Sequence, residues 1–230
     1  MDIQLHYTKT GSGFPLLLLH GNGEEGTYFE HQIPAFAPHF TVYAIDSRGH
    51  GQSPRGTAPF TLSQFADDLA AFMDEQGLEQ ADILGFSDGG NIALLFALRY
   101  PQRVRRLVLN AANLFPEGME PWLLEDLVRE HRALARAETP EALHQKQLLE
   151  LMLREPQIDP AELSALTCPT LVIAGNQDMI QESHTRLIAA NIPGARLAII
   201  PGPHDCAYRN PADFNAAVER FFEETQEEPL

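Results

Sequence analysis

Short apolar runs alternate with longer amphipathic segments along most of the chain. The run Pro15–Leu19 is continuously apolar and Thr41–Ile45 is β-branched and aromatic, as in strands buried on both faces of a parallel sheet. From Leu62–Gln76 apolar residues recur with helical spacing, and Gly77 predicts the end of that helix. The same patterns predict strands over Ile3–Thr8, Ala81–Leu84, Arg106–Leu109, Thr170–Ala174 and Arg196–Ile200, and helices over Thr27–Ala37, Gly90–Tyr100, Glu182–Ala190 and Pro211–Glu224.

The alternation stops between residues 114 and 166. Helical patterns cover Trp122–Ala137 and Pro140–Leu153, and this stretch has no clear strand pattern. We interpret residues 114–166 as a small helical cap inserted into a core made of residues 1–113 and 167–230. The end of the chain, Thr225–Leu230, is predicted to be a frayed tail.

Strands that alternate with helices predict the α/β class, with a mostly parallel central sheet covered by helices on both faces. In such sheets, ligands bind beyond the carboxyl ends of the strands. Functional groups are therefore expected where the predicted strands end. The polar residues at those ends are His20, Asn22, Asp46, Ser87, Asn110, Asp178 and His204.

Composition narrows the range of partners. The 230 residues carry a formal net charge of −16, which argues against nucleic acid or an anionic membrane, because phosphates attract basic surfaces. No apolar run approaches the ~20 residues of a membrane helix, and Met1-Asp2-Ile3 lacks the basic start of a secretory signal. We therefore expect a cytoplasmic protein. Cys168 and Cys206 form neither a disulfide framework nor a metal-ligand spacing, and the oligomeric state is not predicted.

The stretch with the strongest chemical signal is Gly85-Phe86-Ser87-Asp88-Gly89, which has the form G-x-S-x-G between a predicted strand and a predicted helix. A turn this sharp forces Ser87 into a strained backbone region and thrusts its hydroxyl clear of the sheet. Only small residues fit two positions before and after it. The pattern predicts a nucleophilic serine, with an idle serine in a Gly-rich turn as the alternative.

A serine hydroxyl needs a base within hydrogen-bond reach. Of nine histidines, His204 follows the last predicted strand in a rigid Pro-Gly-Pro loop and is the predicted base. His50 is the weaker alternative, and His20 is expected to brace the loop that follows it. Asp178, after the preceding strand, would orient the imidazole; the alternative is a turn or capping residue.

Together these segments resemble the α/β-hydrolase fold superfamily over nearly the whole chain. The segments that carry the resemblance are His20-Gly21-Asn22, the loop from Asp46 to Ser53, Gly85 to Gly90, Gly175-Asn176-Gln177-Asp178 and Pro201-Gly202-Pro203-His204. In similar enzymes the nucleophile, acid and base follow this order. The resemblance implies that the backbone N–H groups of Asn22 and Asp88 bind the oxyanion, with Gly23 as a second choice for the former. Arg48 is expected to pin its loop by ion pairing.

The function expected from the resemblance is that of a serine hydrolase acting on carboxylic esters of small or medium substrates, with no metal or organic cofactor. Ser87 disfavours the haloalkane dehalogenases and epoxide hydrolases of this fold, which use Asp there. Lactone, thioester or carbon–carbon bond hydrolysis stays open, as does a non-catalytic ligand-binding role. The Asp88 carboxylate is a candidate for binding a cationic substrate group or for a purely structural contact. Trp122 is a candidate wall of an acyl pocket or a cap-to-core contact.

Overall fold

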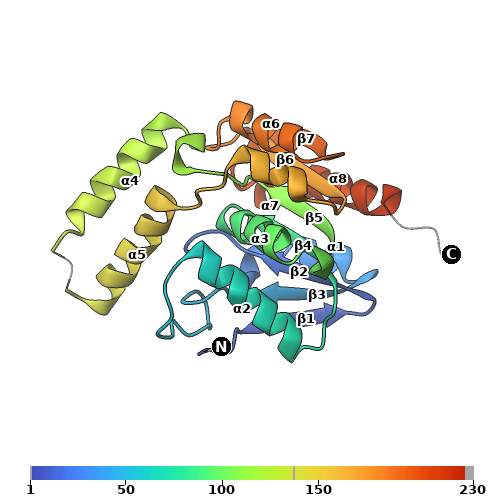
Figure 1. Ribbon diagram of the computed structural model, residues 1–230, viewed down its shortest axis with the longest axis horizontal. Helices are drawn as coiled ribbons and strands as arrows, with labels where there is room; N and C mark the ends of the chain where they lie inside the picture. The colour runs from blue at the N-terminus through green and yellow to red at the C-terminus, as the bar shows by residue number, and fades with distance from the viewer. Residues whose placement is uncertain (1, 137, 226–230) are drawn as a thin grey trace.

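The computed structural model describes residues 2–136 and 138–225, and within them seven strands form one sheet in the order β1-β3-β2-β4-β5-β6-β7. Every pair of neighbouring strands is parallel except β1 and β3. This is the predicted α/β architecture with a mostly parallel sheet (Figure 1). The strands are β1 Tyr7–Gly11, β2 Phe14–Leu19, β3 Phe40–Ile45, β4 Ala81–Phe86, β5 Val104–Asn110, β6 Thr170–Gln177 and β7 Arg196–Pro203.

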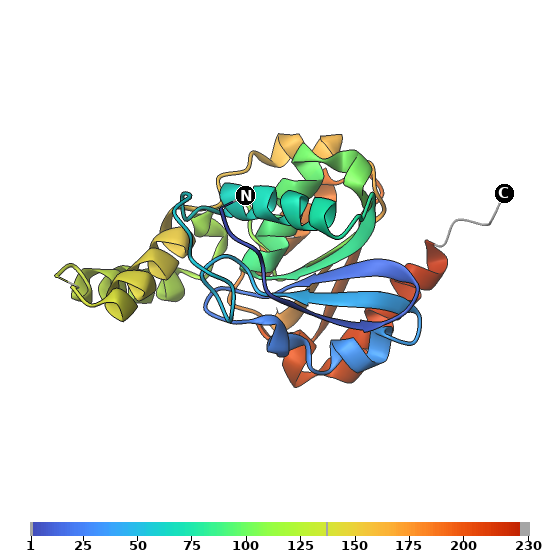
Figure 2. The same ribbon diagram turned by 90° about the horizontal axis from the view of Figure 1, so that it is seen from below.

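Helices cover both faces of the sheet (Figure 2). One core packs α2, α3 and α6 on one face, and a second core packs α1, α7 and α8 on the other. Two further helices, α4 and α5, form the cap and project to one side (Figure 1). The helices are α1 Gln32–Phe36, α2 Leu62–Glu75, α3 Asp88–Arg99, α4 Pro121–Ala133, α5 Pro140–Arg154, α6 Glu182–Asn191, α7 Cys206–Arg209 and α8 Pro211–Glu224.

Strand β2 shows why a continuous apolar run is needed in the middle of this sheet. Leu17 and Leu19 belong to the core on one face, whereas Leu16 and Leu18 belong to the core on the other face. All four are at most 2% exposed. Because successive side chains of a strand point to opposite faces, a polar residue at any of these positions would be buried.

Two sequence predictions about the first fifty residues were wrong in detail. The edge strand begins at Tyr7 rather than Ile3, because Tyr7 pairs with Ile45, the last residue of β3, and earlier residues have no strand beside them. The predicted helix Thr27–Ala37 is instead a short 3₁₀ turn, Gly26–Phe29, followed by α1. Pro34 lacks the N–H that a continuous helix would bond to residue 30, so the helix is interrupted.

The cap region contains the two predicted helices, with α4 ending at Ala133 rather than at Ala137, which lies outside the described residues. The division of the chain into a core and a cap of residues 114–166 stays a prediction. Residues 226–230 of the predicted frayed tail also lie outside the described residues. No helix in the described ranges is long and apolar enough to cross a membrane.

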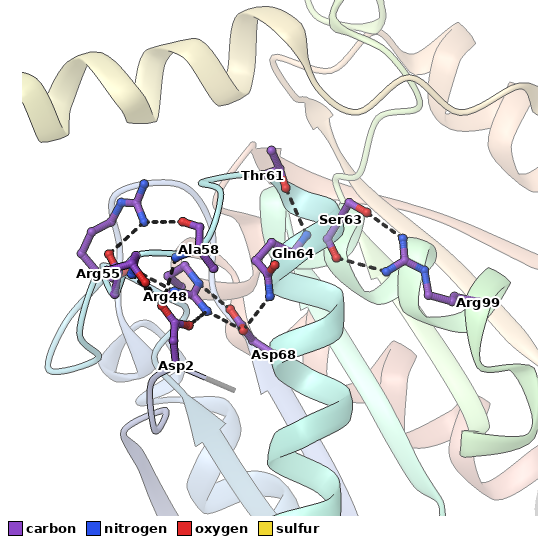
Figure 3. A network of polar contacts seen from close by, with 11 residues as sticks. Asp2, Arg48, Arg55, Ala58, Thr61, Ser63, Gln64, Asp68 and Arg99 are labelled. Carbon is purple, nitrogen blue, oxygen red and sulfur yellow. Dashed lines mark hydrogen bonds and ion pairs between the residues drawn. The ribbon is translucent and has the colours of Figure 1, made fainter.

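Arg48 fixes the loop after β3, as predicted (Figure 3). Its guanidinium is completely buried and donates to both carboxylate oxygens of Asp68 on α2, each at 2.7 Å. It also donates to Asp2 Oδ1 at 2.7 Å. A buried arginine needs such partners because an unpaired charge in the interior is costly. The N-terminus, the loop and α2 are thereby tied together beside the functional strand ends.

Candidate active site

The turn between β4 and α3 has the strained geometry that the sequence predicts. Ser87 has φ 53° and ψ −120°, outside the regions that non-glycine residues favour. A Cβ atom at Gly85 would lie 2.1 Å from the carbonyl oxygen of Gly89, and one at Gly89 would lie 2.0 Å from that of Leu19. The backbone N–H of Ser87 donates to Asn110 O on β5 at 2.8 Å, which holds the turn against the sheet.

Three predicted side chains from separate strand ends meet at this turn. The Oγ atom of Ser87 lies 2.9 Å from Nε2 of His204, and Nδ1 of the same ring lies 2.6 Å from Oδ1 of Asp178. A carboxylate only accepts hydrogen bonds, so we assign the proton to Nδ1 and the free lone pair to Nε2. This tautomer accepts the hydroxyl proton of Ser87, as nucleophilic catalysis requires.

Asp178 has a second hydrogen bond that fixes its orientation. Its Oδ1 atom also accepts from the backbone N–H of Ile180 at 2.9 Å, so the same oxygen serves both the turn and the imidazole. The other oxygen, Oδ2, is buried without a hydrogen-bond partner among the described residues. The side chain is 3% exposed, which shields the ion pair that forms when His204 is protonated.

The two other candidate histidines are committed to the backbone. His20 Nδ1 donates to Gly21 O, and its Nε2 accepts from the N–H of Ser47, so this ring braces its loop as predicted. His50 Nδ1 donates to the carbonyl oxygen of Arg48. Burial is the main cause that lowers the pKa of His50, to about 4. His204, rather than His50, is therefore the imidazole placed on Ser87.

The loop after β2 lies beside the turn. The N–H of Gly21 donates to Glu24 Oε2 at 3.1 Å, and the N–H of Glu24 donates to Gly21 O. Asn22 and Gly23 are the two residues at the tip of the turn that these bonds close. Asp88 is the first residue of α3, and the first N–H groups of a helix have no partner within the helix. The assignment of Asn22 and Asp88 as oxyanion donors stays a prediction.

The Asp88 carboxylate is 8% exposed and accepts two side-chain hydrogen bonds, from Asn22 Nδ2 at 2.9 Å and from Asn91 Nδ2 at 3.4 Å. Burial raises its pKa, and these two bonds oppose the rise. No Lys, Arg or His of the described ranges forms an ion pair with it. Trp122, the other predicted substrate contact, is 55% exposed on α4, and its role stays a prediction.

Sequence reasoning missed the part that three residues around His204 take in the site: Phe86, Tyr28 and Glu24. Phe86 packs against the His204 ring at 4.9 Å, and Tyr28 stacks on Phe86 at 4.4 Å with its hydroxyl buried and unpartnered among the described residues. Glu24 is half-buried, and burial raises its pKa to about 7. Only its place in the Gly-rich loop, two residues after Asn22, pointed to Glu24, and no sequence signal pointed to Tyr28.

The raised pKa of Glu24 predicts a pH-dependent stability. Between its ordinary pKa of 4.5 and about 7, the folded state holds more protons than the unfolded state, so stability falls as pH rises through this window. The Glu24→Gln variant should lack this fall. Between pH 5 and pH 8 its free energy of unfolding should therefore decrease less than that of wild type. Urea unfolding at several pH values measures the difference. Glu25→Gln, at an exposed neighbouring position, is the matched control; identical pH curves for wild type and Glu24→Gln would contradict the prediction.

Comparisons with known proteins agree with this fold. Residues 15–137 match the family described as alpha/beta hydrolase fold. A putative carbamate hydrolase, RutD, from Caulobacter sp. (strain K31) is 32% identical over 90% of this chain and 89% of its own length. The mouse serine hydrolase BPHL is 29% identical over 96% of this chain and 84% of its own length. The solved structure of Est816, an N-acyl homoserine lactone degrading enzyme, superposes with a TM-score of 0.80 at 28% identity, over 95% of this chain and 97% of that one.

Proposed function

The chain belongs to the alpha/beta hydrolase fold family and is a hydrolase, and from this premise we propose that it cleaves carboxylic esters of small or medium substrates through a covalent acyl-enzyme. The observation that carries the proposal is the pair of contacts at one strand edge, 2.9 Å from Ser87 Oγ to His204 Nε2 and 2.6 Å from His204 Nδ1 to Asp178 Oδ1. Both distances lie within the range in which a base can take the proton of a nucleophile.

The first half of the proposed reaction forms the acyl-enzyme. Ser87 Oγ attacks the carbonyl carbon of the ester while its proton moves to His204 Nε2. The negative oxygen of the tetrahedral intermediate is bound by the backbone N–H groups of Asn22 and Asp88. Each such donor is worth about 2.7–4 kcal/mol of barrier. His204 then gives the proton to the departing alkoxide, and Asp178 stabilises the imidazolium throughout.

The second half releases the acid. Water replaces the alcohol, His204 removes a proton from it, and the hydroxide attacks the acyl carbon of the Ser87 ester. The tetrahedral intermediate collapses with return of the proton to Ser87 Oγ, which regenerates the starting site. All proton transfers use His204, so this half of the reaction calls for no residue beyond those already placed at the strand ends.

Esters are proposed because the reaction needs a carbonyl carbon bonded to a group that leaves when His204 protonates it, and the alkoxide of an ester is such a group. Of the relatives named above, RutD is described as a putative carbamate hydrolase and Est816 as a lactone degrading enzyme, and carbamates and lactones share that carbonyl chemistry. Lactones, thioesters and carbon–carbon bonds remain alternatives for the same three side chains. A panel of p-nitrophenyl esters, a thioester, a lactone and a carbamate, compared by kcat/KM, tests the choice. Higher values for any other class than for the esters would replace the proposal.

A non-catalytic ligand-binding role is the alternative from another class. The same panel separates it, because a binding protein would retain these compounds without turnover. The Ser87–His204 contact favours the enzyme, since binding alone needs no base on the serine.

We also propose that the Asp88 carboxylate binds a cationic group of the substrate. A buried carboxylate ordinarily has a cationic partner, and Asp88 has only the amides of Asn22 and Asn91 in the described structure. The Asp88→Asn variant should lower the preference for an aminoacyl ester over its desamino analogue by roughly 10-fold or more, because a hydrogen bond to a charged group is worth about 1.5–3 kcal/mol.

The ratio of the two substrates serves as its own control, since any general damage to the turn affects both esters alike. An unchanged ratio would show that Asp88 has a structural role only.

A further inference from the structure

A buried row of side-chain hydrogen bonds links the nucleophile turn to the point where the chain enters the cap. Asn91 on α3 donates to Asp88 Oδ1 at 3.4 Å and to Asn113 Oδ1 at 2.9 Å, and its own Oδ1 accepts from the N–H of Asn113 at 2.9 Å. Asn113 Nδ2 then donates to Phe115 O at 3.0 Å. Asp88, Asn91 and Asn113 are each at most 8% exposed, so these bonds are shielded from water.

Asn22 continues this row from the turn to the cap helix α5. Its Nδ2 atom donates to Asp88 Oδ2 at 2.9 Å and to the backbone oxygen of Leu148 on α5 at 3.2 Å. An amide nitrogen carries two hydrogens, so both are used by these two acceptors. The two acceptors lie 66 and 126 residues away in the chain. One side chain thus joins three segments: the loop after β2, the nucleophile turn and the cap.

The bend at Asn22 and Gly23 is closed by the bonds between Gly21 and Glu24, but the N–H groups of Asn22 and Gly23 themselves have no hydrogen-bond partner among the described residues. Glycine stands on both sides, at Gly21 and Gly23, and Gly23 has φ +73° with no atom within 4 Å of the place of a Cβ. Glycine populates several backbone regions with similar ease. The side chain of Asn22 adds two contacts to those that close the bend, one to Asp88 and one to the cap, and the direction of the Asn22 N–H depends on them.

We propose that Asn22 is a positioning residue that completes the oxyanion hole only when α5 lies over the nucleophile turn. The proposal rests on the function proposed above, in which the backbone N–H of Asn22 binds the oxyanion. When a bound substrate leaves α5 in place, the oxyanion hole of the enzyme is complete. When a bound substrate displaces α5, the hole is incomplete. The preference of the enzyme for small over large acyl groups would then appear in kcat more than in KM, because the missing interaction belongs to the transition state.

The experiment compares Asn22→Ala and Asn22→Asp with Gln147→Ala. Asn22→Asp keeps the size of the side chain but has no N–H to donate. Gln147 lies next to Leu148 on α5 and its Oε1 accepts from Arg55 Nε at 3.3 Å, so Gln147→Ala removes a different cap-to-core bond and leaves the oxyanion loop untouched. The readouts are kcat and KM for p-nitrophenyl acetate, and hydrogen exchange of residues 140–154 with and without a trifluoromethyl ketone, which forms a tetrahedral adduct with a reactive serine.

Both Asn22 variants should lose about 10- to 100-fold in kcat, with KM changed by less than about 3-fold. This loss in kcat is smaller than the loss of about 10²–10³-fold that follows removal of a whole oxyanion donor. Gln147→Ala should keep kcat within about 2-fold of wild type. Adduct formation should slow exchange of α5 in wild type and Gln147→Ala, but not in the Asn22 variants.

The inference alone is overturned if wild type is active and the Asn22 variants match Gln147→Ala in kcat and in exchange. Unfolding of both Asn22 variants would also overturn it, because the side chain would then serve the fold rather than the loop. If wild type neither forms the adduct nor turns over any substrate, the proposed function fails first and the inference fails with it.

Discussion

Replacement of Ser87 by alanine should lower kcat for ester hydrolysis by about 10⁶-fold, the loss typical of removing the nucleophile of a serine hydrolase. The variant removes only the hydroxyl that lies 2.9 Å from His204 Nε2. The backbone N–H of residue 87 still donates to Asn110 O, and alanine tolerates the same strained φ no worse than serine does. The fold should therefore stay intact, as measured by circular dichroism and thermal unfolding.

The matched control is Ser164→Ala, a serine in the cap region whose hydroxyl donates only to the carbonyl oxygen of Ala161. It should keep wild-type kcat. Retention of full activity by a folded Ser87→Ala enzyme would refute the assignment of the nucleophile, whatever the activity of the control.

Asp178→Ala should lower kcat by about 10⁴-fold, because the variant loses both the orientation and the charge that stabilise the imidazolium of His204. Asp178→Asn should lose distinctly less. The N–H of Ile180 requires an oxygen at the position of Oδ1, so the asparagine should place its carbonyl oxygen there and its NH₂ group at the position of Oδ2. That oxygen can still accept from His204 Nδ1, which keeps the productive tautomer.

The comparison is read from kcat of the two variants under identical conditions. Proline is the one substitution at Ile180 that would remove the backbone N–H, and it would also restrict the backbone of this turn, so the pair of substitutions at Asp178 serves as the control. Equal losses in Asp178→Ala and Asp178→Asn would mean that charge alone matters or that the asparagine takes the opposite orientation.

The positions of Ser87, Asp178 and His204 could be predicted from the sequence because each depends on local patterns. Each residue directly follows the last residue of a strand, and the carboxyl ends of parallel strands lie at one edge of the sheet. The register of β1 could not be predicted, because Ile3 and Leu5 are buried without belonging to the strand. Apolar pattern alone does not distinguish packing against a core from pairing with a strand.

Contacts between segments far apart in the chain could not be predicted from the sequence either. The amide of Asn22 contacts Asp88 and α5, and nothing near residue 22 indicates either partner. Glu24 resembles an ordinary loop acid, and only the tertiary packing buries it enough to raise its pKa. These residues shape the site through burial and long-range hydrogen bonds, which periodicity and motif spacing do not encode.

Covalent labelling with a fluorophosphonate, followed by digestion and mass spectrometry, tests directly whether Ser87 is the nucleophile. We expect one stoichiometric adduct on the peptide that contains Ser87, formed more slowly in an excess of ester substrate and absent in Ser87→Ala. A protein that hydrolyses esters but carries the label elsewhere, or carries none, would contradict the assignment of Ser87 as the nucleophile.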